Sequence, residues 1–176
     1  MDVLQKIKAV VTDPKGFFSA ARSEQGYSDA MKYYAAILLV PLAVELVIQN
    51  MGGTIAEVGV FETLSSVVNV YIVSMLLTFV FAGLIHGVAK LISGVNDFNK
   101  TYRVVAYGMT PSVLLGWVPI AGILASLYSF YVMVQGMKVT HGMTTLKSAV
   151  SVVLVPTIVA VAAVAIGLTL IPYMNW

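Results

Sequence analysis

The stretch TYRVVAYGMTPSVLLGWVPIAG, from Thr101 to Gly122, decides how this chain folds. It is apolar enough to enter a lipid bilayer, but Gly108, Pro111 and Pro119 interrupt it. Proline lacks a backbone N–H and breaks helical hydrogen bonding, so the stretch either crosses a membrane with a kink or dips in and returns. The rest of the chain distinguishes these two topologies.

The composition indicates lipid as the solvent of most of the chain. Of 176 residues, 59% are hydrophobic and only 10% are charged, and the mean hydropathy is +0.92. A soluble domain carries about 25% charged residues. The absence of cysteine excludes disulfides and thiolate catalysis. A net charge of +2 is too small to indicate a nucleic-acid partner.

Five apolar segments follow an N-terminal region of residues 1–32, and each is predicted to be a transmembrane helix. About 20 helical residues cross a bilayer core. The prediction is therefore an all-α polytopic protein with one membrane domain, residues 33–171, and a short external tail, residues 172–176. The segments cover about 33–49, 64–92, 101–117, 119–139 and 148–171.

The distribution of basic residues predicts the orientation, because short loops rich in Lys and Arg stay cytoplasmic. If all five segments cross, every one of the ten basic residues lies on one side. If the stretch from Thr101 only dips in, Lys138 and Lys147 face the exterior instead. The sequence therefore predicts five crossings, with a cytoplasmic N-terminus and an external C-terminus. The ten residues are Lys6, Lys8, Lys15, Arg22, Lys32, Lys90, Lys100, Arg103, Lys138 and Lys147.

The N-terminal region is predicted to form an amphipathic helix and then a short second helix that Thr12 or Asp13 caps, with Pro14 in its first turn. Phe17 and Phe18 of the second helix are expected at the headgroup boundary. The region is either an interfacial collar or a cytosolic appendage packed on the loops. As a collar, it would attract anionic lipids. The candidate lipid-facing residues are Lys6, Lys8, Lys15, Arg22 and Lys32.

The chain resembles the prokaryotic members of the Yip1 family of integral membrane proteins. The resemblance rests on DPKGFF, residues 13–18, and on the run from Asp97 to Pro156. In that run, a basic residue leads into an AY…P helix, and HG and K precede a last helix with a proline. Ser148 stands where Ala is commoner. The matching residues are Arg103, Ala106, Tyr107, Pro111, Pro119, Gly122, Tyr128, His141, Gly142, Lys147, Ser148 and Pro156.

The resemblance implies a multi-pass protein, of the cell membrane in a prokaryote, that acts as an interaction or membrane-organising scaffold. Eukaryotic relatives act in membrane trafficking and bind small prenylated GTPases. This chain has a short N-terminal region and lacks their DLYGP motif, so GTPase binding is not carried over. The expected partners are the bilayer, anionic lipids, a second copy of the chain or other membrane proteins. The alternative is a transporter or channel for a small solute or ion, built on the polar residues of a broken helix.

Two ionisable side chains within the apolar segments are functional candidates. Glu45 is the acid of the first segment; it either binds a proton or cation in a cavity or lies at the water interface. His86 either hydrogen-bonds a neighbouring helix or forms a metal site with His141. No carboxylate or thiolate supports such a metal site at a diagnostic spacing, so no metal or cofactor is predicted.

Other polar and small residues suggest contacts between helices. Gly83 and Gly87 form a GxxxG spacing that lets another helix approach closely. Tyr128, Tyr131 and Gln135 share one helical face. They either hydrogen-bond neighbouring helices, with candidates Asn69, Tyr71, Ser74 and Tyr107 as partners, or line a water-filled path. Enzyme signatures such as HExxH, GxSxG and a phosphate loop are absent, so no catalytic residue is predicted.

Pro111 makes a specific prediction for the opening stretch. It cannot donate a hydrogen bond to the carbonyl of Tyr107, four residues earlier, so a neighbour or water must satisfy that carbonyl. Gly108 would permit the close approach of this neighbour. The stretch is therefore expected to form one short, kinked third helix, with Trp117 at the outer interface.

Overall fold

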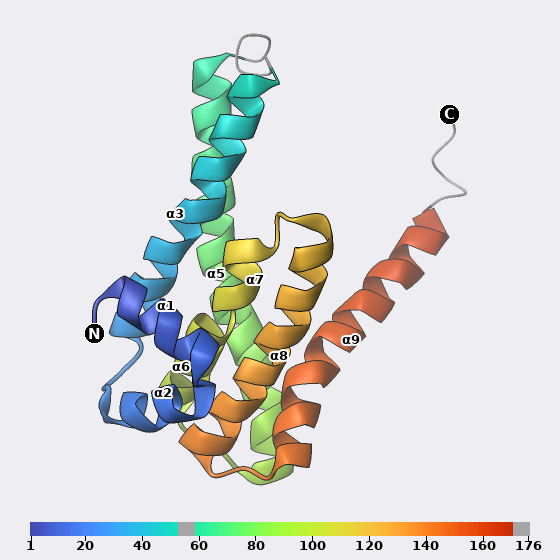
Figure 1. Cartoon of the computed structure of the whole chain (residues 1–176). Helices are drawn as coiled ribbons and strands as arrows, with labels where there is room; N and C mark the ends of the chain where they lie inside the picture. The colour runs from blue at the N-terminus through green and yellow to red at the C-terminus, as the bar shows by residue number, and fades with distance from the viewer. Residues whose placement is uncertain (53–58, 171–176) are drawn as a thin grey trace.

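The computed structural model describes residues 1–52 and 59–170, with backbone only for residues 159–170. The predicted external tail, residues 172–176, lies outside this part of the chain. The described residues form helices joined by short connections (Figure 1), which confirms the all-α prediction. In chain order they are α1 (Val3–Thr12), α2 (Pro14–Ala20), the 3-10 turn η1 (Ala21–Ser23), α3 (Ser28–Met51), α5 (Val60–Ser93), α6 (Phe98–Gly108), α7 (Thr110–Leu115), α8 (Pro119–His141) and α9 (Thr145–Leu170).

Three of the described helices, α3, α5 and α8, are long and apolar enough to cross a membrane. In α9, the part Thr145–Ile158 forms a shorter apolar helix. With 34 residues, α5 extends about 51 Å, well beyond a hydrocarbon core of about 30 Å. It runs antiparallel to α3, and the end of α3 and the start of α5 project past the α7–α8 turn (Figure 1).

The predicted third segment is two helices rather than one kinked helix. The first, α6, ends at Gly108, and α7 begins at Thr110 with Pro111 in its first turn. Proline is tolerated there because the first helical N–H groups have no intrahelical acceptor. The Thr110 hydroxyl donates to the carbonyl of Tyr107 at 2.6 Å, and the N–H of Met109 donates to it too. The carbonyl that Pro111 leaves open is thus satisfied locally, as the sequence required.

The centre of the bundle is α6, which α3, α5 and α8 surround. Every residue from Thr101 to Gly108 is buried, including the large rings of Tyr102 and Tyr107. A Cβ at Gly108 would overlap the side chain of Met133, so glycine allows α6 and α8 to touch. The first turn of α6 is polar, with Asn99 exposed, and the helix is buried from Thr101 onward.

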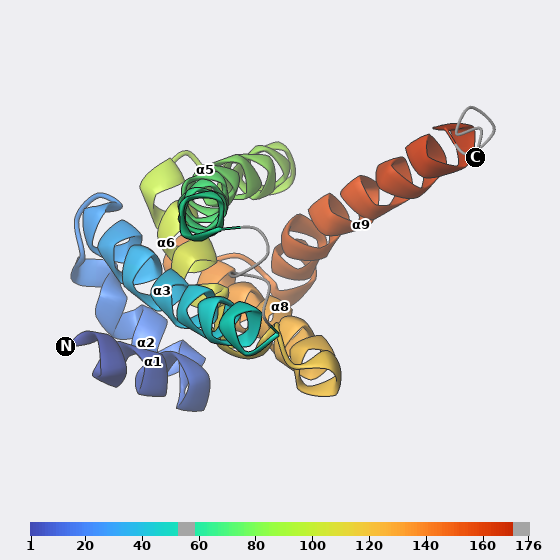
Figure 2. The same cartoon turned by 90° about the horizontal axis from the view of Figure 1, so that it is seen from above.

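The N-terminal helices α1 and α2 pack on the side of the bundle, against α7 and α8 (Figures 1 and 2). As predicted, Asp13 caps α2, and Pro14 lies in its first turn. The expectation for Phe17 and Phe18 was wrong, because both rings are in the protein core. The Phe17 ring meets the Tyr107 ring edge-on, with centroids 4.9 Å apart. Phe18 fills the space that Gly136 leaves on α8.

The last helix diverges from the bundle. Its N-terminal half packs on α5 and α8 through Val152 and Val155, whereas its far end stands apart from every other helix (Figure 2). Along α3, α5 and α8, many large apolar side chains are exposed. Such extensive apolar exposure is expected of helices that face lipid or another protein in a membrane.

Candidate functional site

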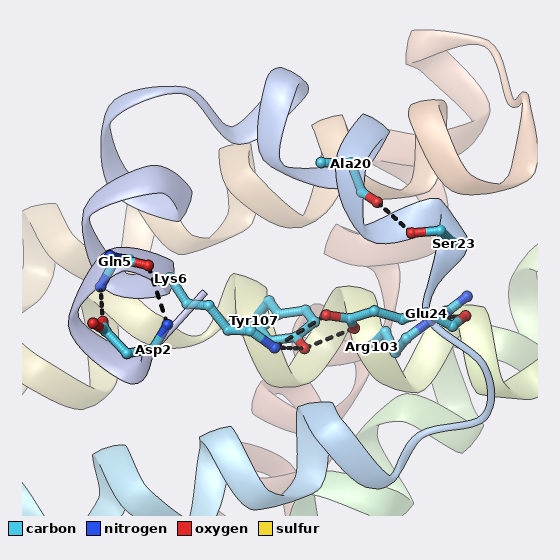
Figure 3. Close-up of polar contacts among 8 residues, drawn as sticks. All are labelled: Asp2, Gln5, Lys6, Ala20, Ser23, Glu24, Arg103 and Tyr107. Atoms are coloured by element: carbon cyan, nitrogen blue, oxygen red, sulfur yellow. Dashed lines mark hydrogen bonds and ion pairs between the residues drawn. The ribbon is translucent and has the colours of Figure 1, made fainter.

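A polar cluster joins the N-terminal region to the central helix (Figure 3). Lys6 Nζ donates to the Tyr107 hydroxyl at 2.9 Å, and this hydroxyl donates to Glu24 Oε2 at 2.8 Å. Lys6 Nζ also pairs with Glu24 Oε1 at 3.0 Å. The Arg103 guanidinium donates to the main-chain carbonyl of Glu24. Each of these charged groups therefore has a partner inside the protein. The cluster holds α1 and the residue that follows η1 against α6.

This cluster corrects the assignment of Lys6 as a lipid-facing residue. Its side chain is only 13% exposed and is committed to Glu24 and Tyr107. Lys8, Lys15 and Lys32 remain exposed and are available to a membrane surface. Arg22 is exposed as well, but its guanidinium donates to the carbonyl of Val139 at the end of α8.

A polar cavity of about 530 Å³ adjoins the cluster, between α1, η1 and the start of α3. Both acidic and basic side chains line it. The charged lining residues are Asp2, Lys6, Glu24, Asp29 and Lys32.

A second cluster brings the two histidines of the chain together. Thr101 Oγ1 lies 3.0 Å from His86 Nδ1 and 3.0 Å from His141 Nε2. A hydroxyl carries one proton, so it donates to one imidazole and accepts from the other. Because the rings meet the hydroxyl with different nitrogens, either direction gives both rings the same tautomer: Nε2–H if Thr101 donates to His86, and Nδ1–H if it donates to His141. Among the described residues, no group of three His, Cys, Asp or Glu side chains could hold a metal ion.

Glu45 lies on α3, apart from both clusters. Its carboxylate accepts a hydrogen bond from Gln49 Nε2 at 2.7 Å. Both residues line a pocket of about 400 Å³ between α3 and α5, which Trp117 borders from the α7–α8 turn. Tyr107 is not among the residues that line this pocket, and its hydroxyl is bound to Lys6 and Glu24.

The tyrosines of α8 do not bond the helices predicted for them. The Tyr128 hydroxyl donates to the carbonyl of Val11 at 2.7 Å, which ties α8 to α1. The Tyr131 ring stacks on that of Tyr128 and is half exposed. Gln135 is half buried. On α5, the Tyr71 hydroxyl donates to the carbonyl of Ala35 in α3 at 3.3 Å.

The predicted packing glycines are on the outer face of α5. Gly83 and Gly87 are exposed, and a Cβ at either position would meet no atom within 4 Å. Within the chain, α5 packs through Ala82, Ile85 and Ala89 instead, all fully buried. Contact through the GxxxG pair therefore stays a prediction about a partner.

Two residues of these clusters were missed in the sequence. Glu24 lies in the connection RSEQGY, where no periodicity points to a partner in α6. Thr101 looked like an ordinary first residue of an apolar segment. A polar residue at the start of a fully apolar run was the one available signal for it.

These features define the class: an all-helical membrane protein whose polar residues form internal clusters. Comparison with family models gives the particular family. The Yip1 domain model matches residues 8–167, and the chain belongs to the Yip1 family. No significant match was found among curated proteins or among solved structures.

Proposed function

We propose that the protein is a membrane-organising scaffold that associates with copies of itself through the outer face of α5. The observation that carries this proposal is the uncovered position of Gly83 and Gly87 in a membrane helix. Small residues let two helix backbones approach, and in lipid such close packing is a main source of helix association. The internal polar clusters hold the monomer together, and no catalytic role is proposed for them.

The glycines belong to a longer row on the same face. Its members are exposed and recur with the alternating spacing of three and four residues that two long helices need to pack along a common seam. They are Asn69, Val73, Leu76, Val80, Gly83 and Gly87. The row covers the middle and the cytoplasmic half of α5.

Asn69 favours a second copy as the partner. Within the described residues its amide has no hydrogen-bond partner, although it lies on the apolar outer face. An amide both donates and accepts, so two copies of Asn69 facing each other across a two-fold axis satisfy one another. A single polar residue in such a seam also fixes the register of the two helices.

The proposal includes the five-crossing topology with a cytoplasmic N-terminus. In this arrangement α6 and α7 cross together, because residues 98–115 rise about 27 Å. The exposed Lys8, Lys15 and Lys32 would then contribute up to about 1 kcal/mol each to the attraction of anionic lipid headgroups.

Cysteine crosslinking tests the interface directly, because the chain has no cysteine of its own. We expect Val73→Cys and Leu76→Cys to form disulfide-linked dimers in the membrane under mild oxidation. Leu64→Cys, exposed on another side of α5, serves as the control and should stay monomeric. Crosslinking of all three to the same extent would refute the proposed face.

A second candidate function, transport of a small solute, draws on one observation, the acidic pocket beside Glu45. Cation uptake into proteoliposomes that contain the native chain, and its loss in Glu45→Gln, would favour transport over the scaffold function.

A further inference from the structure

The pocket between α3 and α5 has the features of a ligand site, and the proposed self-association through α5 does not involve it. Its volume of about 400 Å³ is within the range of small-molecule pockets. Its apolar lining includes Leu38, Leu42 and Val67. Polar side chains of the same two helices line it as well. These are Glu45, Gln49, Ser66, Tyr71 and Ser74.

Glu45 is exposed and is the one charged side chain among the described residues that line the pocket. Glu45 accepts a hydrogen bond from the neutral amide of Gln49, and among the described residues the ion pairs are Lys6–Glu24 and Lys100–Asp97. No basic side chain lines the pocket. A carboxylate beside apolar surface, without a protein cation, is complementary to a ligand with positive charge.

Trp117 narrows the class of this ligand. Its Nε1–H donates to the carbonyl of Leu114 at 2.9 Å, so the indole is held in place and its only N–H is used. What the ring offers to the pocket is its π system, which attracts cations that are poorly hydrated. Ca²⁺ takes six to eight oxygen ligands, and the described residues hold no group of three His, Cys, Asp or Glu side chains that could bind a metal ion.

We propose that this pocket binds a monovalent organic cation with an apolar body, of the ammonium or phosphonium type. Glu45 supplies the counter-charge, Trp117 contacts the cationic head, and the apolar lining from α3 and α5 covers the apolar part. The same chemistry occurs in a soluble amine and in the amine headgroup of a lipid. The proposal does not depend on association through α5, because the pocket residues are distinct from the outer row of that helix.

Binding of radiolabelled tetraphenylphosphonium to the full-length protein in nanodiscs tests the site. We expect Glu45→Gln to weaken saturable binding at least tenfold and Trp117→Leu to weaken it several-fold. Glu45→Asp, which keeps the charge, should retain much of the affinity. Glu62→Gln in the first turn of α5 is the matched control, because Glu62 does not line the pocket, and it should bind like the native chain. Tetraphenylborate, of the same shape and opposite charge, should show no component that depends on Glu45.

Equal binding by the native chain and Glu45→Gln would overturn the proposal, provided that both give the same circular dichroism and elution volume. Saturable tetraphenylborate binding that Glu45→Gln also removed would overturn it too. Comparison of nanodiscs with and without phosphatidylethanolamine identifies the source. If phosphatidylethanolamine weakens tetraphenylphosphonium binding to the native chain but not to Glu45→Gln, the natural ligand is the amine headgroup of a lipid. If it has no such effect, the natural ligand is a soluble cation. A loss of oligomers in Gly83→Leu with unchanged tetraphenylphosphonium binding would separate this site from the scaffold.

Discussion

The hydroxyl of Tyr107 in the central helix donates a hydrogen bond of 2.8 Å to the carboxylate of Glu24, 83 residues earlier in the chain. Through this contact, the N-terminal region becomes part of the helical bundle rather than an independent collar. Of the two interpretations of this region, packing against the rest of the protein agrees with the structure. Its outer face still presents exposed lysines.

The first prediction concerns the contacts of Tyr107 with Lys6 and Glu24. Tyr107→Phe removes the hydroxyl that accepts from Lys6 and donates to Glu24, and we expect it to cost about 1 to 2 kcal/mol of local stability. Tryptic cleavage after Lys15 should then become about 5 to 30 times faster, since it follows the population of the opened state. Tyr131→Phe, which alters an exposed hydroxyl, is the control. Equal cleavage rates for both variants would show that the contact does not hold the region.

The second prediction concerns the threonine between the histidines. Thr101→Val keeps the shape of the side chain but leaves two imidazole nitrogens without their partner, which costs about 1 to 3 kcal/mol. Thr101→Ser should restore most of this stability. In nitrogen NMR spectra of labelled histidine, His86 and His141 should show the same single tautomer in the native chain and a mixture of tautomers in Thr101→Val. Unchanged spectra in Thr101→Val would contradict the bridging role.

Much of the fold follows from the sequence, because apolar length and charge asymmetry act locally. The positions of α3, α5 and α8, the cap at Asp13 and the satisfied carbonyl of Tyr107 all follow from neighbouring residues. The partners of Lys6 and Tyr128 could not be predicted in this way. Both depend on how α1 docks on the bundle, which tertiary packing decides. Similarly, Phe17 and Phe18 suit a membrane boundary and a protein core equally well by composition.

The third prediction concerns pH and the cap of α6. Asp97 accepts from the backbone N–H of Lys100 at 3.3 Å and pairs with its ammonium at 3.5 Å. Burial raises the pKa of Asp97, but the hydrogen bond and the charge of Lys100 outweigh it, so the pKa is lowered overall. A carboxylate whose pKa is lowered in the folded state stabilises the protein at pH values above its unfolded-state pKa. This stabilisation is lost as the pH falls below about 4 and the carboxylate is protonated.

We therefore expect Asp97→Asn, which can still cap the helix, to lose this acid-sensitive part of the stability. The effect should stay below about 1 kcal/mol, because the pair is partly exposed and screened. Melting temperatures of the two proteins, measured from pH 7 to pH 3, should converge at the acid end. A constant difference across this range would count against the assignment.

The fourth prediction concerns topology. A membrane-impermeant maleimide should label Glu62→Cys, at the start of α5, from outside intact cells. Thr145→Cys, exposed at the start of α9, should react only after the membrane is opened. Labelling of Thr145→Cys alone from outside would show that the orientation is the opposite of the one proposed. Labelling of both cysteine variants from outside would exclude the proposed topology.

The central claim is association through the outer face of α5, and subunit counting tests it most directly. Gly83→Leu fills space that is empty in the monomer, so the fold should remain while the close approach of a second helix is blocked. Leu64→Phe, which adds bulk at an exposed position on another side of α5, is the control. In single-molecule photobleaching at low protein density in lipid, we predict two steps for the native chain and for Leu64→Phe, and one step for Gly83→Leu. Two steps for all three proteins, or one step for the native chain, would contradict the account.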